Sequence, residues 1–337
     1  MTDGERSAPD GADPAPRPRT GWRAGMRTLV GRFGAAAERL RAARRGARTA
    51  WDGWRARHPG VVPAARRAAH AAMLAALAAA ATLYAIRVLD WYGGATVDDA
   101  GITYAYADNL AAGRGLRMTP GEAPTEGFSN PLQVLLLAPL ARFVDDLDPA
   151  SKALNVGLAA VAFALLCAFV YLQLRGFARV LAFVPLGLAA YWCGFDYWLA
   201  AGLEGGLLTA LQIGSLLALH YAPRHRAADT TLGVTAGLLA WTRPEGLVYG
   251  GIVVGVRLLR SPAGRRLRAA AIFAGLLALL VVLRWLLFRE LVPNTYWAKV
   301  PGRGLWWSLT DTDGPGWVYL ASFLHDRWWY FAIPLWA

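Results

Sequence analysis

The chain has 337 residues, of which 56% are hydrophobic and only 17% are charged. A soluble domain of this length cannot bury so much apolar surface, so the composition excludes an ordinary soluble fold and indicates a helical membrane protein. A formal net charge of +12 is typical of nucleic-acid-binding proteins, but its distribution argues against such a partner. The arginines gather in the N-terminal tail and in short loops beside apolar runs, as in cytoplasmic segments.

Residues 1–65 are rich in Ala, Pro, Gly and Arg and contain no sustained apolar run. We expect a basic cytoplasmic tail that is largely disordered, although the composition also allows a basic helix over 21–57. The transmembrane domain is expected to occupy 66–337. The cysteines Cys167 and Cys193 lie in apolar runs without metal-ligand spacing, so we interpret both as small buried hydrophobes.

Several apolar runs follow the tail in chain order. They occupy 69–86, 153–172, 180–195, 207–221 and 269–288, with two shorter pieces over 230–259 and an aromatic-rich segment over 316–337. A helix needs about 20 residues to cross a bilayer, so the short pieces must be tilted, extended into the interface or shielded by neighbours. The pattern predicts an all-α polytopic membrane protein.

Residues 131–143 are apolar but short, so they permit either a crossing helix or an interfacial one. If they do not cross, the arginine-rich loops at 175–179, 224–226 and 257–268 all face the cytoplasm. If they cross, those loops move outside and the aspartates of 145–148 move inside. The positive-inside rule favours the first arrangement.

The same rule places the N-terminus in the cytoplasm, because Arg66 and Arg67 precede the first apolar run. The outer loop then extends over about 89–152. This topology brings several polar motifs to the non-cytoplasmic side, as a shared active site would require. Those motifs contain Asp98, Asp99, Glu126, Glu204, Glu245 and the segment 293–299. We find no internal repeat of the kind expected for a transporter.

Asp98 and Asp99 follow the first apolar run closely. One carboxylate can take a proton from an acceptor hydroxyl while the other orients that acceptor or holds a cation. The alternative is structural, with one of them capping a helix that begins near Ala100. A divalent cation stays open as a cofactor, although two adjacent carboxylates are too few ligands to argue for one.

Glu126 and Asn130 lie in a segment, 124–131, that is equally typical of a turn before a helix. Glu204 lies in the glycine-rich segment 201–206, at the outer end of two apolar runs. A carboxylate near membrane depth tends to face a cavity or a partner, although an interfacial residue reaching into water is an equal alternative.

Arg243 and Glu245 flank Pro244, which must end or interrupt a helix. A guanidinium beside freed backbone groups can bind a phosphate, whereas the alternative is a structural ion pair of Arg243 with Glu245 or Glu204. Farther along, Tyr296 and Lys299 offer an aromatic face for a sugar and a point charge for a phosphate. Aromatic residues also serve simply as interfacial anchors.

Taken together and in order, these motifs resemble those of actinobacterial polyprenyl-phosphate-dependent arabinofuranosyltransferases. The group that adds the terminal β-(1→2)-arabinofuranose to cell-wall arabinan shows the greatest similarity. The motifs that carry the resemblance occupy 98–104, 106–110, 113–116, 126–131, 202–204, 242–246 and 293–299.

The resemblance implies a GT-C fold: a multi-helix transmembrane bundle with interfacial helices in the first outer loop and an extracytoplasmic active site, here in the plasma membrane. It implies a polyprenyl-phosphate-linked arabinofuranose donor and a glycan acceptor. The implied catalytic residues are Asp98 and Asp99. The implied acceptor- or sugar-binding residues are Tyr104, Glu126, Asn130, Glu204, Glu245 and Tyr296. The implied donor-phosphate residues are Arg243 and Lys299.

Family members are often longer, with a carbohydrate-binding domain after the membrane part, so we expect a fragment or a reduced relative. A GT-C enzyme that transfers mannose or another pentose is the main alternative. Others are a lipid-linked-sugar transporter, which predicts polar groups on both faces, and a non-catalytic scaffold. Here the polar motifs lie mostly on one face, with Arg284 as an exception. The acceptor, the anomeric outcome and the oligomeric state stay open.

Overall fold

The computed structural model of the protein describes residues 20–260, 267–291, 293–295 and 315–327, and every regular element within these ranges is a helix. The chain divides into two compact units, Met1–Ala72 and Met73–Ala337. The boundary lies inside α2 (Val61–Tyr92) rather than between residues 65 and 66, where the change in composition predicts it.

The first unit contains α1 (Thr20–Arg57), a helix of 38 residues. This helix matches the basic helix that the sequence allows over 21–57, and within the described residues it replaces the disorder expected for most of the tail. The physical reason is local, because Ala and Arg have high helix propensities and Arg55 and Arg57 in the last turn complement the helix dipole. The disorder expected before residue 20 concerns residues outside the described ranges.

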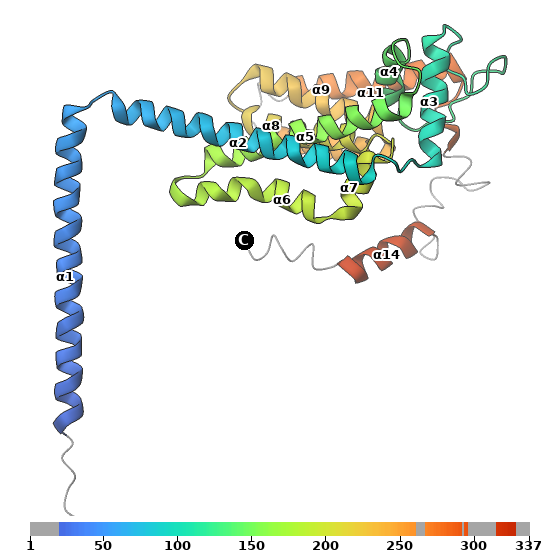
Figure 1. The fold of residues 1–337 in the computed structure, drawn as a ribbon. Helices are drawn as coiled ribbons and strands as arrows, with labels where there is room; N and C mark the ends of the chain where they lie inside the picture. The colour runs from blue at the N-terminus through green and yellow to red at the C-terminus, as the bar shows by residue number, and fades with distance from the viewer. Residues whose placement is uncertain (1–19, 261–266, 292, 296–314, 328–337) are drawn as a thin grey trace, which may run out of the picture. The chain divides into compact units, whose positions relative to one another are not determined.

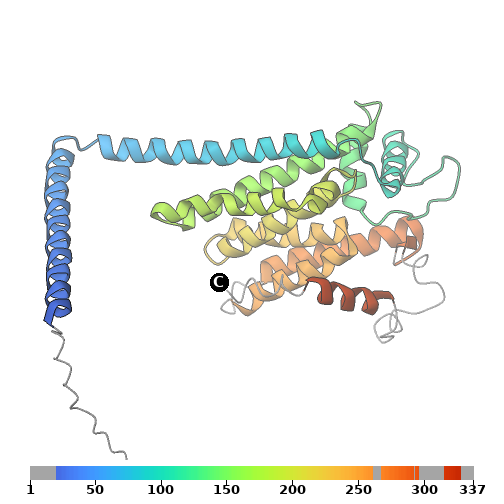
Figure 2. The same ribbon diagram turned by 60° about the horizontal axis from the view of Figure 1, so that its bottom comes forward.

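The second unit consists of helices, most of which pack together as a bundle. In chain order after α2 they are α3 (Asp98–Ala111), α4 (Pro131–Leu140), α5 (Leu147–Gln173), the 3-10 helix η1 (Gly176–Phe183), α6 (Val184–Tyr191), α7 (Cys193–Ala200), α8 (Gly205–Tyr221), α9 (Arg226–Thr242), α10 (Pro244–Leu259), α11 (Leu267–Phe288) and α14 (Pro315–Arg327). Figures 1 and 2 show α5, α8, α9 and α11 lying side by side.

Three described helices are long and apolar enough to cross a membrane, namely the Pro63–Tyr92 part of α2, α5 and α11. A fourth span results if Gly176–Tyr191 and Cys193–Ala200, which meet at an angle of 74°, are counted together. The prediction of transmembrane helices is confirmed in this form. The two cysteines differ from each other, since Cys167 is buried as expected whereas Cys193 is exposed.

The shorter helices α8, α9 and α10 shield one another, as the sequence predicts for short apolar pieces. α9 packs against both of the others and against α11. Gly233 and Gly237 on α9 permit the close approach of α11, because a Cβ at Gly233 would lie 2.7 Å from the Ala269 carbonyl oxygen. Small residues spaced four apart are the usual device for close helix packing in a membrane.

α4 covers Pro131–Leu140 and is only 10 residues long. A helix of that length spans about 15 Å, half of the roughly 30 Å of a hydrocarbon core. Its length agrees with the predicted non-crossing segment. α4 packs against α3 and α9, which buries Val134 and Leu137, whereas Leu135 and Leu136 are exposed.

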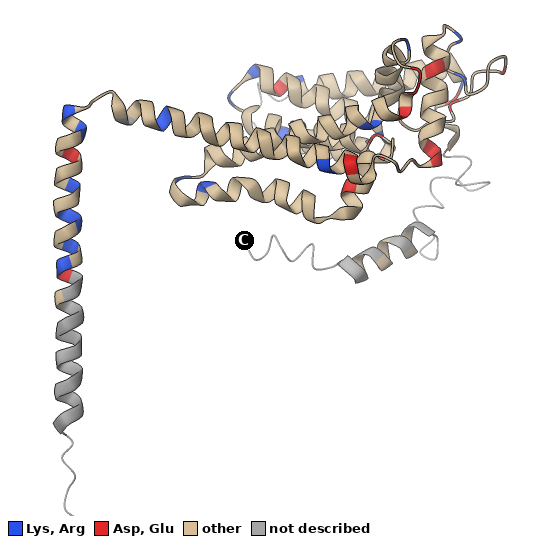
Figure 3. Cartoon of the chain, in the orientation of Figure 1, with Lys and Arg blue, Asp and Glu red and all other residues tan. Residues whose placement is uncertain are grey.

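The bundle has two chemically different ends, which Figure 3 shows by colour. At the acidic end, α2, α7, α9 and α11 finish and α3, α5, α8 and α10 begin. At the basic end, α5, α8 and α10 finish and α9 and α11 begin. Apart from Asp229, the described acidic residues between α2 and α11 lie in or beside the acidic end. The predicted convergence of the polar motifs is therefore present.

Candidate functional site

A polar cavity of about 140 Å³ opens at the acidic end of the bundle. It is built where the start of α3, the loop before α4, the turn before α8 and the junction of α9 with α10 meet. Its described lining residues are Asp99, Ile102, Thr103, Gly127, Phe128, Ser129, Asn130, Leu203, Glu204, Arg243 and Thr295. Four residues predicted for the site are therefore brought together: Asp99, Asn130, Glu204 and Arg243.

Asp98 and Asp99 are the first two residues of α3, and Val97 occupies the N-cap position. Neither aspartate is the N-cap that the structural alternative requires. Two carboxylates in a first turn complement the positive end of the helix dipole, which stabilises the start of α3. Asp99 lines the polar cavity, whereas Asp98 is not among the described residues around it. Of the two neighbouring aspartates, the structure thus places Asp99 at the cavity.

Glu204 lies at the centre of the polar network. Its side chain is only 3% exposed, so the alternative of a residue reaching into water is wrong. One carboxylate oxygen accepts a hydrogen bond from Nη1 of Arg243 at 2.6 Å, and the other accepts one from Nδ2 of Asn130 at 2.6 Å. A buried carboxylate needs such partners, because an unpaired buried charge is strongly destabilising.

Asn130 shows that this network takes precedence over local helix capping. It occupies the N-cap position of α4, with Pro131 following at the start of the helix, yet its side chain makes no capping hydrogen bond. The amide instead donates to Glu204 and to Oγ1 of Thr103, the second at 3.1 Å. The predicted turn before a helix is therefore present, and a functional role for Asn130 stays a prediction.

Arg243 lies in extended backbone between α9 and α10, as expected for a residue that precedes a proline. Nη1 contacts Glu204, while Nε and Nη2 contact Glu245, with 3.1 Å between Nη2 and Oε1. Both ion pairs of the structural alternative are therefore confirmed. Burial lowers the pKa of Arg243, but the carboxylates of Glu245 and Glu204 outweigh burial and leave that pKa raised.

The same guanidinium remains accessible to a ligand. The Arg243 side chain is 37% exposed and lines the cavity, and a guanidinium has more N–H donors than these contacts use. Glu245 is more exposed still, at 68% of its side chain. Glu245 is not among the described residues that line the cavity, so it balances the charge of Arg243 from outside.

Glu126 belongs to a different part of the same end. Both of its carboxylate oxygens accept hydrogen bonds from Nε of Arg284, at 2.9 and 3.0 Å, with Glu126 buried and Arg284 half-buried. Burial raises the pKa of Glu126, and the charge of Arg284 opposes that shift. The sequence analysis predicted Glu126 as a sugar-binding residue and treated Arg284 as an exception to the one-sided distribution of polar groups. The structure joins these two residues.

This pair borders an apolar cavity of about 240 Å³. Its other described lining residues are Leu116, Phe128, Pro131, Leu135, Trp241, Leu280, Leu283, Leu287 and Phe288. Phe128 lines both this cavity and the polar one, so the two lie next to each other. The acidic end therefore presents a polar and an apolar compartment side by side.

Tyr104 is not among the residues that the structure shows around the polar cavity. Its hydroxyl donates to Oδ1 of Asp148 at 3.1 Å and to the carbonyl of Gly202 at 3.2 Å, and burial raises its pKa. Gln133 and Ser151 donate to the same carbonyl. Tyr104 therefore helps to hold the turn that carries Glu204.

Gly202 is required in that turn. Its φ of +87° favours glycine, and a Cβ would collide with the Tyr104 hydroxyl. Sequence reasoning missed Gln133 and Ser151. Gln133 is a polar residue inside the apolar run 131–143, which is a usable signal because buried polar groups are almost always hydrogen-bonded, whereas Ser151 precedes the run 153–172 and gives no such signal.

Two predicted site residues, Tyr296 and Lys299, lie outside the described residues. Thr295, immediately before them, lines the polar cavity. Within the described ranges, no three His, Cys, Asp or Glu side chains gather as a metal site would require.

No protein-family model matches the chain, no curated protein matches it, and no solved structure matches it. The resemblance to arabinofuranosyltransferases accordingly depends on the ordered motifs alone.

Proposed function

We propose that this protein is a membrane glycosyltransferase that moves arabinofuranose from a polyprenyl-phosphate donor to a cell-wall arabinan acceptor on the outer face of the plasma membrane. The observation that carries the proposal is the pair of adjacent cavities at the acidic end. One is polar, with Asp99, Glu204 and Arg243, and the other is apolar, with Phe128 lining both. A lipid-linked sugar needs such a pair of compartments.

The apolar cavity suits the isoprenoid chain of the donor. Five of its residues belong to α11, and α11 also exposes large apolar side chains such as Val282 and Leu286, as a lipid-facing helix does. In the proposed arrangement the isoprenoid enters from the bilayer beside α11. The phosphate and sugar then extend past Phe128 into the polar cavity, where Arg243 is available to the phosphate.

The proposed chemistry is a single displacement at the anomeric carbon. The acceptor hydroxyl loses its proton to the Asp99 carboxylate as its oxygen forms the new glycosidic bond. The bond between the anomeric carbon and the phosphate oxygen breaks, and its electron pair leaves with polyprenyl phosphate. Arg243 stabilises the charge that develops on that leaving group. Glu204 and Glu245 hold the guanidinium in place.

The charge distribution supports the proposed orientation. Arginines dominate the basic end, which the positive-inside rule assigns to the cytoplasm. The polar cavity at the opposite end then faces outward, toward a cell-wall acceptor.

The test is transfer of radiolabelled arabinose from a polyprenyl-phosphate donor to a short arabinan by the purified protein. Asp99→Asn should reduce kcat by about 100-fold or more, the usual contribution of a positioned general base. Asp108→Asn is the matched control, because Asp108 is an exposed aspartate on the same helix, away from the cavity.

Full activity in Asp99→Asn would contradict the proposed base. The same assay also separates the sugar alternatives, because unlabelled polyprenyl-phosphate mannose should compete poorly with the arabinose donor. Strong competition or direct transfer of mannose would instead identify the related enzyme of the main alternative.

A further inference from the structure

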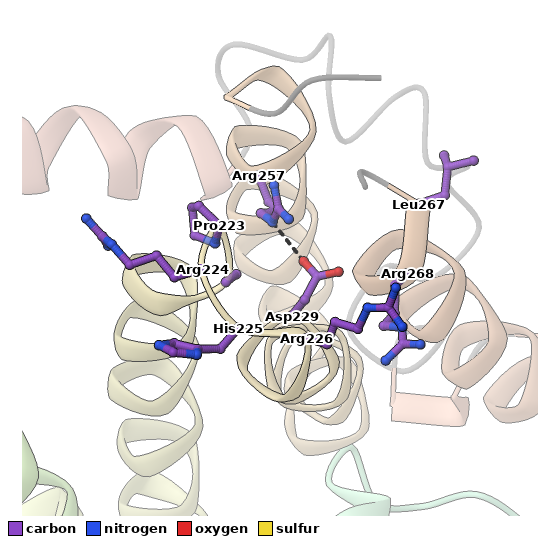
Figure 4. Close-up of a pocket in the computed structure, with 9 residues that line it drawn as sticks. Pro223, Arg224, His225, Arg226, Asp229, Arg257, Leu267 and Arg268 are labelled. Atoms are coloured by element: carbon purple, nitrogen blue, oxygen red, sulfur yellow. Dashed lines mark hydrogen bonds and ion pairs between the residues drawn. The ribbon is translucent and has the colours of Figure 1, made fainter. Parts of the chain in front are cut away.

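The basic end of the bundle contains a cavity that the proposed transferase does not use. Its volume is about 460 Å³, within the usual range of about 300–1,000 Å³ for small-ligand sites. Figure 4 shows its lining, which comes from the α8–α9 turn, the first turn of α9, the end of α10 and the start of α11. The lining residues are Ala222, Pro223, Arg224, His225, Arg226, Asp229, Arg257, Leu267 and Arg268.

A buried ion pair connects two of these helices. Nε of Arg257 donates to Oδ1 of Asp229 at 2.7 Å, and the two side chains are only 3% and 6% exposed. Figure 4 shows Arg257 directed from α10 toward Asp229 on α9. The pair joins the walls of the cavity and accounts for its one described carboxylate.

The remaining charged groups around the cavity are positive. Nη1 of Arg268 contacts Oγ1 of Thr230 at 3.3 Å, which holds the start of α11 against the first turns of α9. Arg226 begins α9, and Arg224 lies in the preceding turn, pointing away from the Arg257–Asp229 pair in Figure 4. The positive end of the α9 dipole adds to this field. Four arginines therefore line a cavity whose one described aspartate is already paired with one of them.

We propose that this cavity binds a phosphate group, supplied either by the headgroup of an anionic phospholipid or by free phosphate. Arg226 on α9 and Arg268 on α11 line a space of ligand size, and guanidinium groups match phosphate oxygens in geometry as well as charge. A basic pocket between membrane helices on the cytoplasmic side is also where anionic headgroups are recognised. The site is independent of the proposed transferase.

The same end contains ordinary basic residues for comparison. Arg175, beyond α5, and Arg260, at the end of α10, are exposed and are not among the described residues of the cavity. They carry the same charge at the same end of the bundle. A property due to general surface charge would depend on them as much as on Arg226 and Arg268.

The test measures binding to the purified full-length chain in zwitterionic phosphatidylcholine nanodiscs. The probes are short-chain phosphatidic acid, short-chain phosphatidylcholine and inorganic phosphate. We expect phosphatidic acid to bind, and the Arg226→Gln/Arg268→Gln variant to bind it at least tenfold more weakly. The matched variant, Arg175→Gln/Arg260→Gln, should remain within about twofold of the unmodified protein.

The phosphate arm distinguishes the two sources. Binding of inorganic phosphate that is lost in Arg226→Gln/Arg268→Gln identifies free phosphate as sufficient, whereas binding of phosphatidic acid alone identifies a lipid headgroup. Equal weakening in both double variants would overturn the proposal, because the attraction would then be general. Failure of both anionic probes to bind the unmodified protein would overturn it as well. Unchanged unfolding midpoints in detergent show that the exposed-arginine variants remain folded.

Discussion

Both ends of the bundle contain an ion pair with a buried carboxylate, but the arginine of the pair is accessible at the acidic end and buried at the basic end. At the acidic end, Glu204 is 3% exposed while its partner Arg243 is 37% exposed. At the basic end, Arg257 and Asp229 are both buried. An arginine that pairs with a buried carboxylate can therefore still expose part of its guanidinium to a ligand. A pair in which both side chains are buried instead holds together the helices that carry it.

The proposed functions of the two ends require that they lie on opposite sides of the membrane. In a variant with Cys167 and Cys193 replaced by Ala, Asp108→Cys should react with a membrane-impermeant maleimide added to intact cells. Arg175→Cys should react only after the cells are permeabilised, because positive loops stay in the cytoplasm. The reverse pattern would exclude an extracytoplasmic polar cavity.

The accessible arginine of the acidic end can be tested by its effect on turnover. Arg243→Gln should lower kcat for arabinose transfer by about 10²–10³-fold, the usual cost of removing one group that stabilises developing negative charge. Arg243→Lys should recover part of this loss, since it restores the charge without the forked geometry.

The control for Arg243 is Arg142→Gln, which removes an exposed arginine at the same end. It should leave kcat unchanged. Wild-type turnover in Arg243→Gln would assign Arg243 a purely structural role in its ion pairs.

The difference in burial predicts a difference in stability. Asp229→Ala leaves Arg257 as an unpaired charge in a buried position, so the free energy of unfolding should fall by about 3–5 kcal/mol. Glu204→Ala should cost less, because water can reach Arg243. Denaturant unfolding in detergent would measure both. Asp229→Leu/Arg257→Met should regain much of the loss. An equal cost for Asp229→Ala and Glu204→Ala would refute this account.

The smallest expected effect concerns the turn that carries Glu204. Tyr104→Phe removes a hydroxyl that donates to Asp148 and to the Gly202 carbonyl, so the free energy of unfolding should fall by about 1 kcal/mol. If Tyr104 only positions this turn, kcat should fall modestly while the KM for the acceptor stays unchanged. A large rise in that KM would support the direct sugar contact predicted from the sequence.

Parts of this site follow from local chemistry. Pro244 predicts the break between α9 and α10, and the extended backbone of Arg243 follows from the proline beside it. Pro131 likewise predicts the start of α4, with Asn130 before it. The low hydrophobicity of the N-terminal tail favours disorder, whereas the high helix propensities of Ala and Arg favour a helix. The structure shows that helix propensity prevails over Thr20–Arg57.

Other parts depend on residues that are far apart in the sequence. Glu126 and Arg284 are 158 residues apart, and neither identifies the other by spacing or periodicity. The neighbours Asp98 and Asp99 have the same chemistry, yet the rotation from one helical position to the next leaves only Asp99 among the described cavity residues. Tyr104 is assigned to the Gly202 turn by the packing of α3 against α5 and the turn before α8.

The sequence by itself determined that this protein is helical and apolar, and that its acidic motifs alternate with its arginine-rich loops. These properties depend on composition and on residues within a few turns of each other. Only the tertiary structure decided that Glu204 is shared by Asn130 and Arg243, that Glu126 pairs with Arg284, and that arginines at the basic end enclose a cavity. Those contacts join separate helices, so helix packing selects the partners.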